Sequence, residues 1–203
     1  MSASREAFVR SLGFEPDTFQ LTAMDSLDAG ASVLVAAPTG SGKTLVAEYA
    51  VHRAVGEYKR AFYTAPIKAL SNQKYRDLCE LWGAERVGLL TGDNAVNADA
   101  PVVVMTTEVL RNMIYGRSHA LDDLAVVVLD EVHHAGDERA WGDGVRTAFE
   151  HAHRRLCVSG TPFRNHCQES GASPSAVASR ITVSPSSADR PAGCAVSVGA
   201  SCL

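Results

Sequence analysis

The sequence predicts an α/β protein built in three layers, with a mainly parallel β-sheet between two layers of helices. From residue 33 to residue 160, short runs rich in β-branched residues alternate with longer amphipathic stretches. The short runs are apolar almost without a break, which is typical of strands buried on both faces of a parallel sheet. Polar, glycine-bearing segments follow several of these runs, and ligands of parallel sheets bind at the carboxyl ends of the strands.

Each element follows from one of these two patterns. Runs rich in Val, Leu or aromatic residues predict strands at 33–37, 61–65, 87–91, 102–106, 126–130 and 156–159. The amphipathic stretches between them predict helices at 44–57, 71–82, 108–115 and 144–153. Residues 5–164 are therefore expected to form one domain.

The last part of the chain differs in composition. Residues 165–203 hold nine Ser and seven Ala, no Lys and no aromatic residue. They show neither the helical nor the strand period and have too few large apolar residues to bury a core. This segment is predicted to be a disordered tail.

Composition excludes several classes of protein. The net charge of −4 gives no global basic field, so any binding of nucleic acid has to use local groups. The five cysteines show no C-x-x-C spacing, which argues against a disulfide framework or a zinc ribbon. The sequence has neither a run of about 18 apolar residues nor an apolar signal core at its N-terminus. These features predict a cytoplasmic protein without a membrane partner.

The segment 37–44, Ala-Pro-Thr-Gly-Ser-Gly-Lys-Thr, lies between a predicted strand and a predicted helix. Gly40 and Gly42 allow the backbone N–H groups to converge on an anion, and the helix N-terminus adds further donors. Lys43 can reach the β- and γ-phosphates of a nucleotide, and the Thr44 hydroxyl can bind Mg²⁺. The usual motif begins with Gly where this chain has Ala37, and a plain Gly/Ser turn is the alternative. The candidate phosphate-binding residues are Pro38, Thr39, Gly40, Ser41, Gly42, Lys43 and Thr44.

Two carboxylates follow the apolar run 126–129. Asp130 is suited to hold Mg²⁺, directly or through water, and Glu131 to act as the base that activates an attacking water. The alternative is that the acids merely end a strand. The functional interpretation requires the loop near Gly40 and the pair 130–131 to lie side by side on neighbouring strand ends, facing one triphosphate.

With the segment Asp130-Glu131-Val132-His133, the phosphate loop resembles motifs I and II of superfamily 2 helicases of the DExH-box kind. That resemblance implies a RecA-like P-loop NTPase domain that uses ATP and Mg²⁺. Residues 14–20 resemble the adenine-recognition motif of the same group, so Gln20 is expected to read adenine and Phe14 to stack on it. For Phe14, a place in the core is the alternative.

Segments 64–74, 91–93 and 105–111 are similar to motif Ia and the two elements after it in the superkiller/exosome-associated RNA helicases. Their hydroxyl, amide and cationic groups can hold a sugar-phosphate backbone without reading bases. For Lys68 a solvated helix face is the alternative, and for Thr107 a helix cap. The candidate nucleic-acid contacts are Pro66, Lys68, Asn72, Gln73, Thr91, Gly92, Thr107 and Arg111.

The segment 159–161 stands where this family has a motif III that links the state of ATP to strand binding. Ser159 and Thr161 are the candidate coupling residues, and His133 is expected to connect the acidic pair to them. Zinc binding by His133 and the histidines after it is disfavoured because their spacing fits no closed site.

After His133 the resemblance weakens, and residues 135–164 look more like motors of the restriction or repair type. Nothing in 165–203 resembles the second RecA-like domain that supplies arginine fingers, which are worth about 10³ to 10⁵ in rate. We therefore expect the motor domain of an ATP-dependent RNA helicase that, alone, hydrolyses ATP slowly and does not unwind. The alternatives are a DNA translocase motor and an inactive ATP-binding remnant, while a small-molecule kinase is disfavoured.

Overall fold

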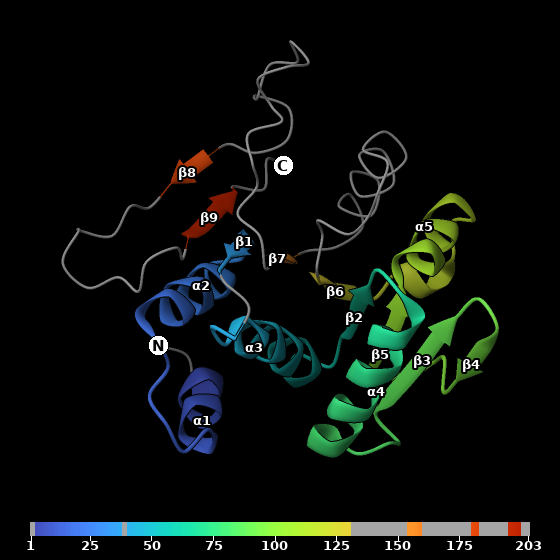
Figure 1. Cartoon of the computed structure of the whole chain (residues 1–203), viewed down its shortest axis with the longest axis horizontal. Coiled ribbons are helices and arrows are strands. Elements are labelled where there is room, and N and C mark those ends of the chain that lie inside the picture. The colour runs from blue at the N-terminus through green and yellow to red at the C-terminus, as the bar shows by residue number, and fades with distance from the viewer. Residues whose placement is uncertain (1–2, 38–39, 131–153, 160–179, 183–194, 200–203) are drawn as a thin grey trace, which may run out of the picture.

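The computed structural model describes residues 3–37, 40–130, 154–159, 180–182 and 195–199. Within them, one sheet has the strand order β4-β3-β5-β2-β6-β7-β1-β9-β8 (Figure 1). The strands are β1 Ser32–Ala36, β2 Arg60–Ala65, β3 Val87–Thr91, β4 Asn94–Val96, β5 Val102–Thr106, β6 Leu124–Asp130, β7 Arg154–Ser159, β8 Arg180–Thr182 and β9 Ala195–Gly199.

In the part of the chain that the structure describes, two helices precede the sheet and three connect its strands (Figure 1). They are α1 Ala3–Ser11, α2 Thr18–Asp28, α3 Lys43–Gly56, α4 Lys68–Trp82 and α5 Thr107–Tyr115, with the 3₁₀ helix η1 at His119–Leu121. Helices α3, α4 and α5 each begin within seven residues of the end of a strand, β1, β2 and β5 respectively. The beginnings of these helices are therefore brought to the carboxyl edge of the sheet.

The six central strands, β3, β5, β2, β6, β7 and β1, all run parallel. Their carboxyl ends consequently lie at one edge of the sheet, where the candidate site residues were expected. Antiparallel strands flank this block, β4 beside β3 and β9 beside β1. The mainly parallel α/β sheet predicted from the sequence is confirmed.

Alternate residues of the central strands enter two separate cores, one on each face of the sheet. Tyr63 and Val128 pack with residues of α1 to α4 on one face. Phe62 and Val127 pack with α5 and η1 on the other. Complete burial of such a side chain contributes about 1.5–3 kcal/mol, so helices on both faces are needed to cover these strands. This is the three-layer arrangement.

The predicted elements differ from the structure mainly at their ends. All six predicted strands exist and their ends shift by two residues at most. Helix α4 begins at Lys68, three residues before the predicted start at residue 71. Its N-cap residue Ile67, directly after Pro66, is extended (φ −132°, ψ 151°), so the chain enters the helix at the next residue. The predicted helix at 144–153 lies outside the described residues.

The tail also departs from the prediction in two places. Segments 180–182 and 195–199 are strands at the sheet edge beside β1, where no regular structure was expected. The alternation in Ala195-Val196-Ser197-Val198 suits a strand, but four residues give a weak signal within a Ser/Ala-rich segment. The disordered tail at 165–203 stays a prediction, and these two short strands are the part of it that the structure describes.

Candidate nucleotide and nucleic-acid site

The candidate phosphate loop leaves the carboxyl end of β1 and runs into the first residue of α3. Gly40 (φ +84°) and Gly42 (φ +79°) are both left-handed, a conformation in which residues with a Cβ are strained. Lys43 is buried, and its Nζ donates a hydrogen bond to the carbonyl oxygen of Ala37, 2.6 Å away. The lysine thus lies folded against the loop that precedes it.

The same loop carries a buried hydroxyl. Among the described residues, Ser41 Oγ has no hydrogen-bond partner. A buried polar atom without a partner costs about 1–3 kcal/mol, and a bound oxyanion is one way to satisfy it. Thr44, in the first turn of α3, is half-buried and carries a second hydroxyl three residues after Ser41. The donors and glycines present here fit a nucleotide phosphate.

Gln20 connects α2 to the loop. Its Nε2 donates to the carbonyl oxygen of Gly42 (2.9 Å), and its Oε1 accepts from the backbone N–H of Asp17 (2.8 Å). The side chain is buried, and a primary amide keeps a second donor hydrogen and a second acceptor lone pair for another partner. Phe14, expected to stack on adenine, is 58% exposed and so is not a core residue.

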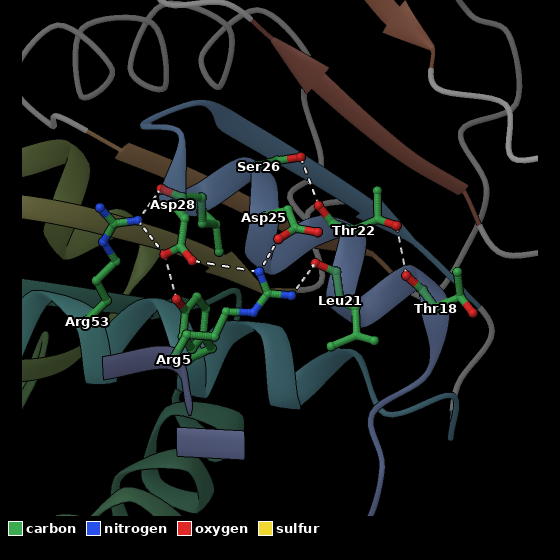
Figure 2. A network of polar contacts seen from close by, with 10 residues as sticks. Arg5, Thr18, Leu21, Thr22, Asp25, Ser26, Asp28 and Arg53 are labelled. Carbon is green, nitrogen blue, oxygen red and sulfur yellow. Dashed lines mark hydrogen bonds and ion pairs between the residues drawn. The ribbon is translucent and has the colours of Figure 1, made fainter. Parts of the chain in front are cut away.

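Ion pairs between α1, α2 and α3 hold this part of the domain together (Figure 2). The guanidinium of Arg5, in α1, is buried and pairs with Asp25 and Asp28 of α2. Asp28 Oδ1 also accepts hydrogen bonds from Arg53 Nη1 (2.6 Å) and from the hydroxyl of Tyr49 (2.5 Å), both in α3. The helix that carries Gln20 is thereby fixed against the helix that begins at Lys43.

Asp130 ends β6 at the same edge of the sheet as the phosphate loop. The sequence predicted that the two would lie on neighbouring strand ends. That prediction was wrong, because β7 lies between β6 and β1. Sequence alone does not give the order of strands in a sheet, and the later strand 154–159 enters between two earlier ones. All three strands are parallel, so Asp130 and the loop still share one edge.

A buried tyrosine contacts Asp130. The hydroxyl of Tyr63, in β2, donates a hydrogen bond to Asp130 Oδ2 over 2.6 Å. Burial and the neighbouring carboxylate of Asp130 raise the pKa of Tyr63 well above its usual range, so the phenol stays protonated and remains a donor. Sequence reasoning missed this residue, because only the pairing of β2 with β6 brings it to Asp130.

The candidate nucleic-acid contacts gather at the ends of the neighbouring strands β3, β5 and β2. Lys68 forms an ion pair with Asp93, which also accepts a hydrogen bond from Thr91 Oγ1 (3.1 Å). These two partners lower the pKa of Asp93. Thr107 Oγ1 donates to the carbonyl oxygen of Ala65 (3.3 Å), tying the end of β2 to the start of α5.

The remaining members of this group are spread over two helix starts and one loop. Arg111 lies in α5, with its Nη2 3.9 Å from Glu108 Oε1. In α4, Asn72 is half-buried and Gln73 exposed, while Pro66 precedes the helix and Gly92 follows β3 in an exposed loop. Sequence reasoning did not identify Asp93 as the partner of Lys68, although Asp93 belongs to segment 91–93, which was singled out.

Five of the predicted site residues lie outside the described residues: Pro38, Thr39, Glu131, His133 and Thr161. Ser159 ends β7, the strand between the two that carry the loop and Asp130. Within the part of the chain that the structure describes, no group of three His, Cys, Asp or Glu side chains is placed to hold a metal ion. None of the described helices has the length and apolar character needed to cross a membrane.

A parallel sheet with a left-handed glycine loop after one strand and a carboxylate at the same edge defines a RecA-like α/β domain of the P-loop type. The chain belongs to the DEAD/DEAH box helicase family, whose model matches residues 17–169. Use of a nucleotide goes with that membership. The resemblance to superfamily 2 DExH helicases drawn from the sequence is confirmed.

Individual relatives agree with the family. The probable helicase HelY of Mycobacterium leprae is 58% identical over 130 residues, 64% of this chain and 14% of HelY. The DExH-box ATP-dependent RNA helicase DExH15, chloroplastic, of Arabidopsis thaliana is 50% identical over 130 residues, 61% of this chain and 11% of the relative. The chain thus spans a small part of the curated relatives it matches.

A solved structure shows the same fold. The helicase Lhr of Mycobacterium smegmatis, bound to single-stranded DNA and AMP-PNP, superposes with a TM-score of 0.63 at 27% identity. The match covers 79% of this chain and 25% of Lhr.

Proposed function

We propose that this chain is the ATP-binding motor domain of an ATP-dependent RNA helicase. The observation that carries the proposal is the division of one sheet edge into two halves. The ends of β1, β7 and β6 hold the phosphate loop, Ser159 and Asp130. The ends of β2, β5 and β3 hold the candidate contacts to a nucleic-acid backbone. ATP and a single strand then have separate places on one continuous edge.

In the first half, loop N–H groups, Ser41 and Lys43 bind the phosphates, with Lys43 exchanging its bond to Ala37 for the β- and γ-phosphates. Thr44 and Asp130 carry the hard oxygen donors that Mg²⁺ prefers and would hold it, and the ion would neutralise phosphate charge. Glu131 activates the attacking water. Pro38, Thr39, Gly40 and Gly42 shape the loop.

Recognition of the base falls to the segment before α2. Gln20 uses its second donor and acceptor sites on the edge of adenine, and the exposed ring of Phe14 stacks on its face. Because Gln20 contacts the loop through Gly42, the base and the phosphates are sensed by one connected segment. His133, Ser159 and Thr161 relay the state of this half to the strand-binding half.

In the second half, Lys68 and Arg111 supply cations, and Pro66, Asn72, Gln73, Thr91, Gly92 and Thr107 line the path of one strand. These groups contact phosphate and sugar without reading bases. The relative DExH15 is named an RNA helicase, and segment 64–74 resembles RNA helicases, so RNA is the proposed substrate. Lhr was solved with single-stranded DNA, which makes a DNA motor the second candidate.

Turnover requires more than these residues. Helicases of this superfamily bind ATP between two RecA-like domains, and the second supplies arginine fingers. We propose that the 203-residue chain binds ATP alone and hydrolyses it slowly until a second RecA-like domain is supplied. RNA-stimulated, multiple-turnover hydrolysis by the chain alone would contradict this.

Equilibrium binding of a fluorescent ATP analogue tests the nucleotide half. Lys43→Ala should weaken binding at least tenfold, whereas Lys59→Ala, an exposed lysine in the turn after α3, should leave it unchanged. Unchanged affinity in Lys43→Ala refutes the phosphate-loop assignment. Competition between single-stranded RNA and duplex DNA then decides between the two substrates. ATP binding without turnover, in both the parent chain and Glu131→Gln with the second domain supplied, would indicate an inactive remnant.

A further inference from the structure

The pairing of β2 with β6 places a tyrosine hydroxyl on the carboxylate proposed to hold Mg²⁺. Tyr63 is in register with Val128, and Asp130 lies two residues further along β6, so the three side chains share one face of the sheet. The phenol points along the strands to the carboxyl edge and donates to Asp130 Oδ2 over 2.6 Å.

The surroundings of Tyr63 stabilise this hydrogen bond. Tyr63 is 1% exposed and packed in the core beneath α3, which leaves its ring little freedom to turn. A buried phenol needs a partner, and a hydrogen bond to a carboxylate is among the stronger kinds. Asp130 cannot rotate without breaking this bond or moving a packed aromatic ring. The tyrosine therefore fixes the direction in which the carboxylate presents its oxygens.

We infer that Tyr63 is a positioning residue that orients Asp130 toward the Mg²⁺ of a bound nucleotide. The inference rests on the proposed function and deepens it. Removing a residue that hydrogen-bonds to a metal ligand usually lowers the affinity for the metal by about 10- to 100-fold. Tyr63 also lies two residues before the end of β2, which leads to Pro66 and Lys68. A single strand thus carries both the support of the metal ligand and the approach to the nucleic-acid path.

The test compares two tyrosines that lose only a hydroxyl. Tyr63→Phe removes the bond to Asp130, and Tyr49→Phe removes a comparable buried bond, to Asp28, within the α1–α3 ion-pair network. Affinity for a fluorescent ATP analogue is measured for the 203-residue chain in EDTA and across a Mg²⁺ titration. Mg²⁺ should increase the affinity for the ATP analogue. We expect Tyr63→Phe to raise the Mg²⁺ concentration at half of that increase by about tenfold. Affinity in EDTA should stay unchanged, and Tyr49→Phe should change neither quantity.

A double-mutant cycle with Asp130→Asn separates positioning from general loosening of the core. If Tyr63 acts through Asp130, adding Tyr63→Phe to Asp130→Asn causes no further loss of metal dependence. An equal loss in both backgrounds overturns the inference. The inference is also overturned if the parent chain binds the nucleotide in a metal-dependent way and Tyr63→Phe leaves that dependence unchanged. A parent chain that shows no metal-dependent nucleotide binding overturns the proposed function and this inference together.

Discussion

The amide of Gln20 donates a hydrogen bond from Nε2 to the carbonyl oxygen of Gly42, 2.9 Å away, and so joins the first turn of α2 to the loop before α3. The same amide accepts a hydrogen bond from the N-cap residue of α2, Asp17. One buried side chain therefore closes a helix N-terminus and supports the backbone of the phosphate loop. The position of that loop depends on both.

Gly42 cannot accept a side chain without disturbing this link. Its φ of +79° is unfavourable for other residues by about 1–2 kcal/mol, and an added Cβ would lie 2.6 Å from Gln20 Nε2. We predict that Gly42→Ala lowers the free energy of unfolding by at least 2 kcal/mol and weakens ATP binding. Urea denaturation and nucleotide titration measure the two effects.

Gly13→Ala is the matched control for Gly42→Ala. Gly13 has a similar φ of +70°, but an added Cβ there meets nothing within 4 Å. It should show the backbone penalty of about 1–2 kcal/mol without the loss of ATP binding. Equal effects of the two substitutions on ATP binding would show that the contact with Gln20 has no part in shaping the loop.

Arg5 joins three helices through buried charge. Replacing it with Met keeps much of the apolar stem and leaves Asp25 and Asp28 without the guanidinium between them. We predict a loss of about 1–3 kcal/mol in the free energy of unfolding, because Asp28 keeps Arg53 and Tyr49 as partners. Arg10→Met, on an exposed position of the same helix, should change stability by less than about 0.5 kcal/mol. If Arg5→Met also changed the free energy of unfolding by less than about 0.5 kcal/mol, the ion pairs of Arg5 with Asp25 and Asp28 would not stabilise the fold.

The ion pair between Lys68 and Asp93 is expected to be visible in a titration. Asp93 has a lowered pKa, chiefly because of Lys68 and then Thr91. A lowered folded-state pKa stabilises the fold above the unfolded pKa, and this contribution disappears as pH falls through the folded-state value. We predict that Lys68→Met raises the pKa of Asp93 toward its usual value, as followed by NMR of the side-chain carboxyl.

The same variant tests the proposed strand path. Lys68→Met should weaken binding of single-stranded RNA and reduce its dependence on salt, because one phosphate contact is lost. Lys59→Met serves as the control for nonspecific loss of charge and should alter neither the pKa of Asp93 nor the salt dependence. A pKa of Asp93 that does not move in Lys68→Met would mean that the ion pair does not form in solution.

Much of this architecture could be predicted from the sequence, because buried parallel strands and a glycine-bearing loop have strong local signatures. All six predicted strands exist, and α3 begins at Lys43, one residue before its predicted start. Properties that depend on the order of strands could not be predicted. The insertion of β7 beside β1 and the contact of Tyr63 with Asp130 both arise from pairings between segments distant in sequence. The strand at 195–199 was missed because its alternation is too short to recognise.

The ring of Phe8 packs against Tyr49, with the ring centroids 5.3 Å apart, and against His52. Phe8 and Arg5 both lie upstream of residue 17, where the match to the family begins. A recombinant fragment trimmed to that boundary would uncover apolar surface on α3 and strip Asp28 of one cation. We therefore expect a fragment that begins at residue 17 to have a lower free energy of unfolding than one that includes α1.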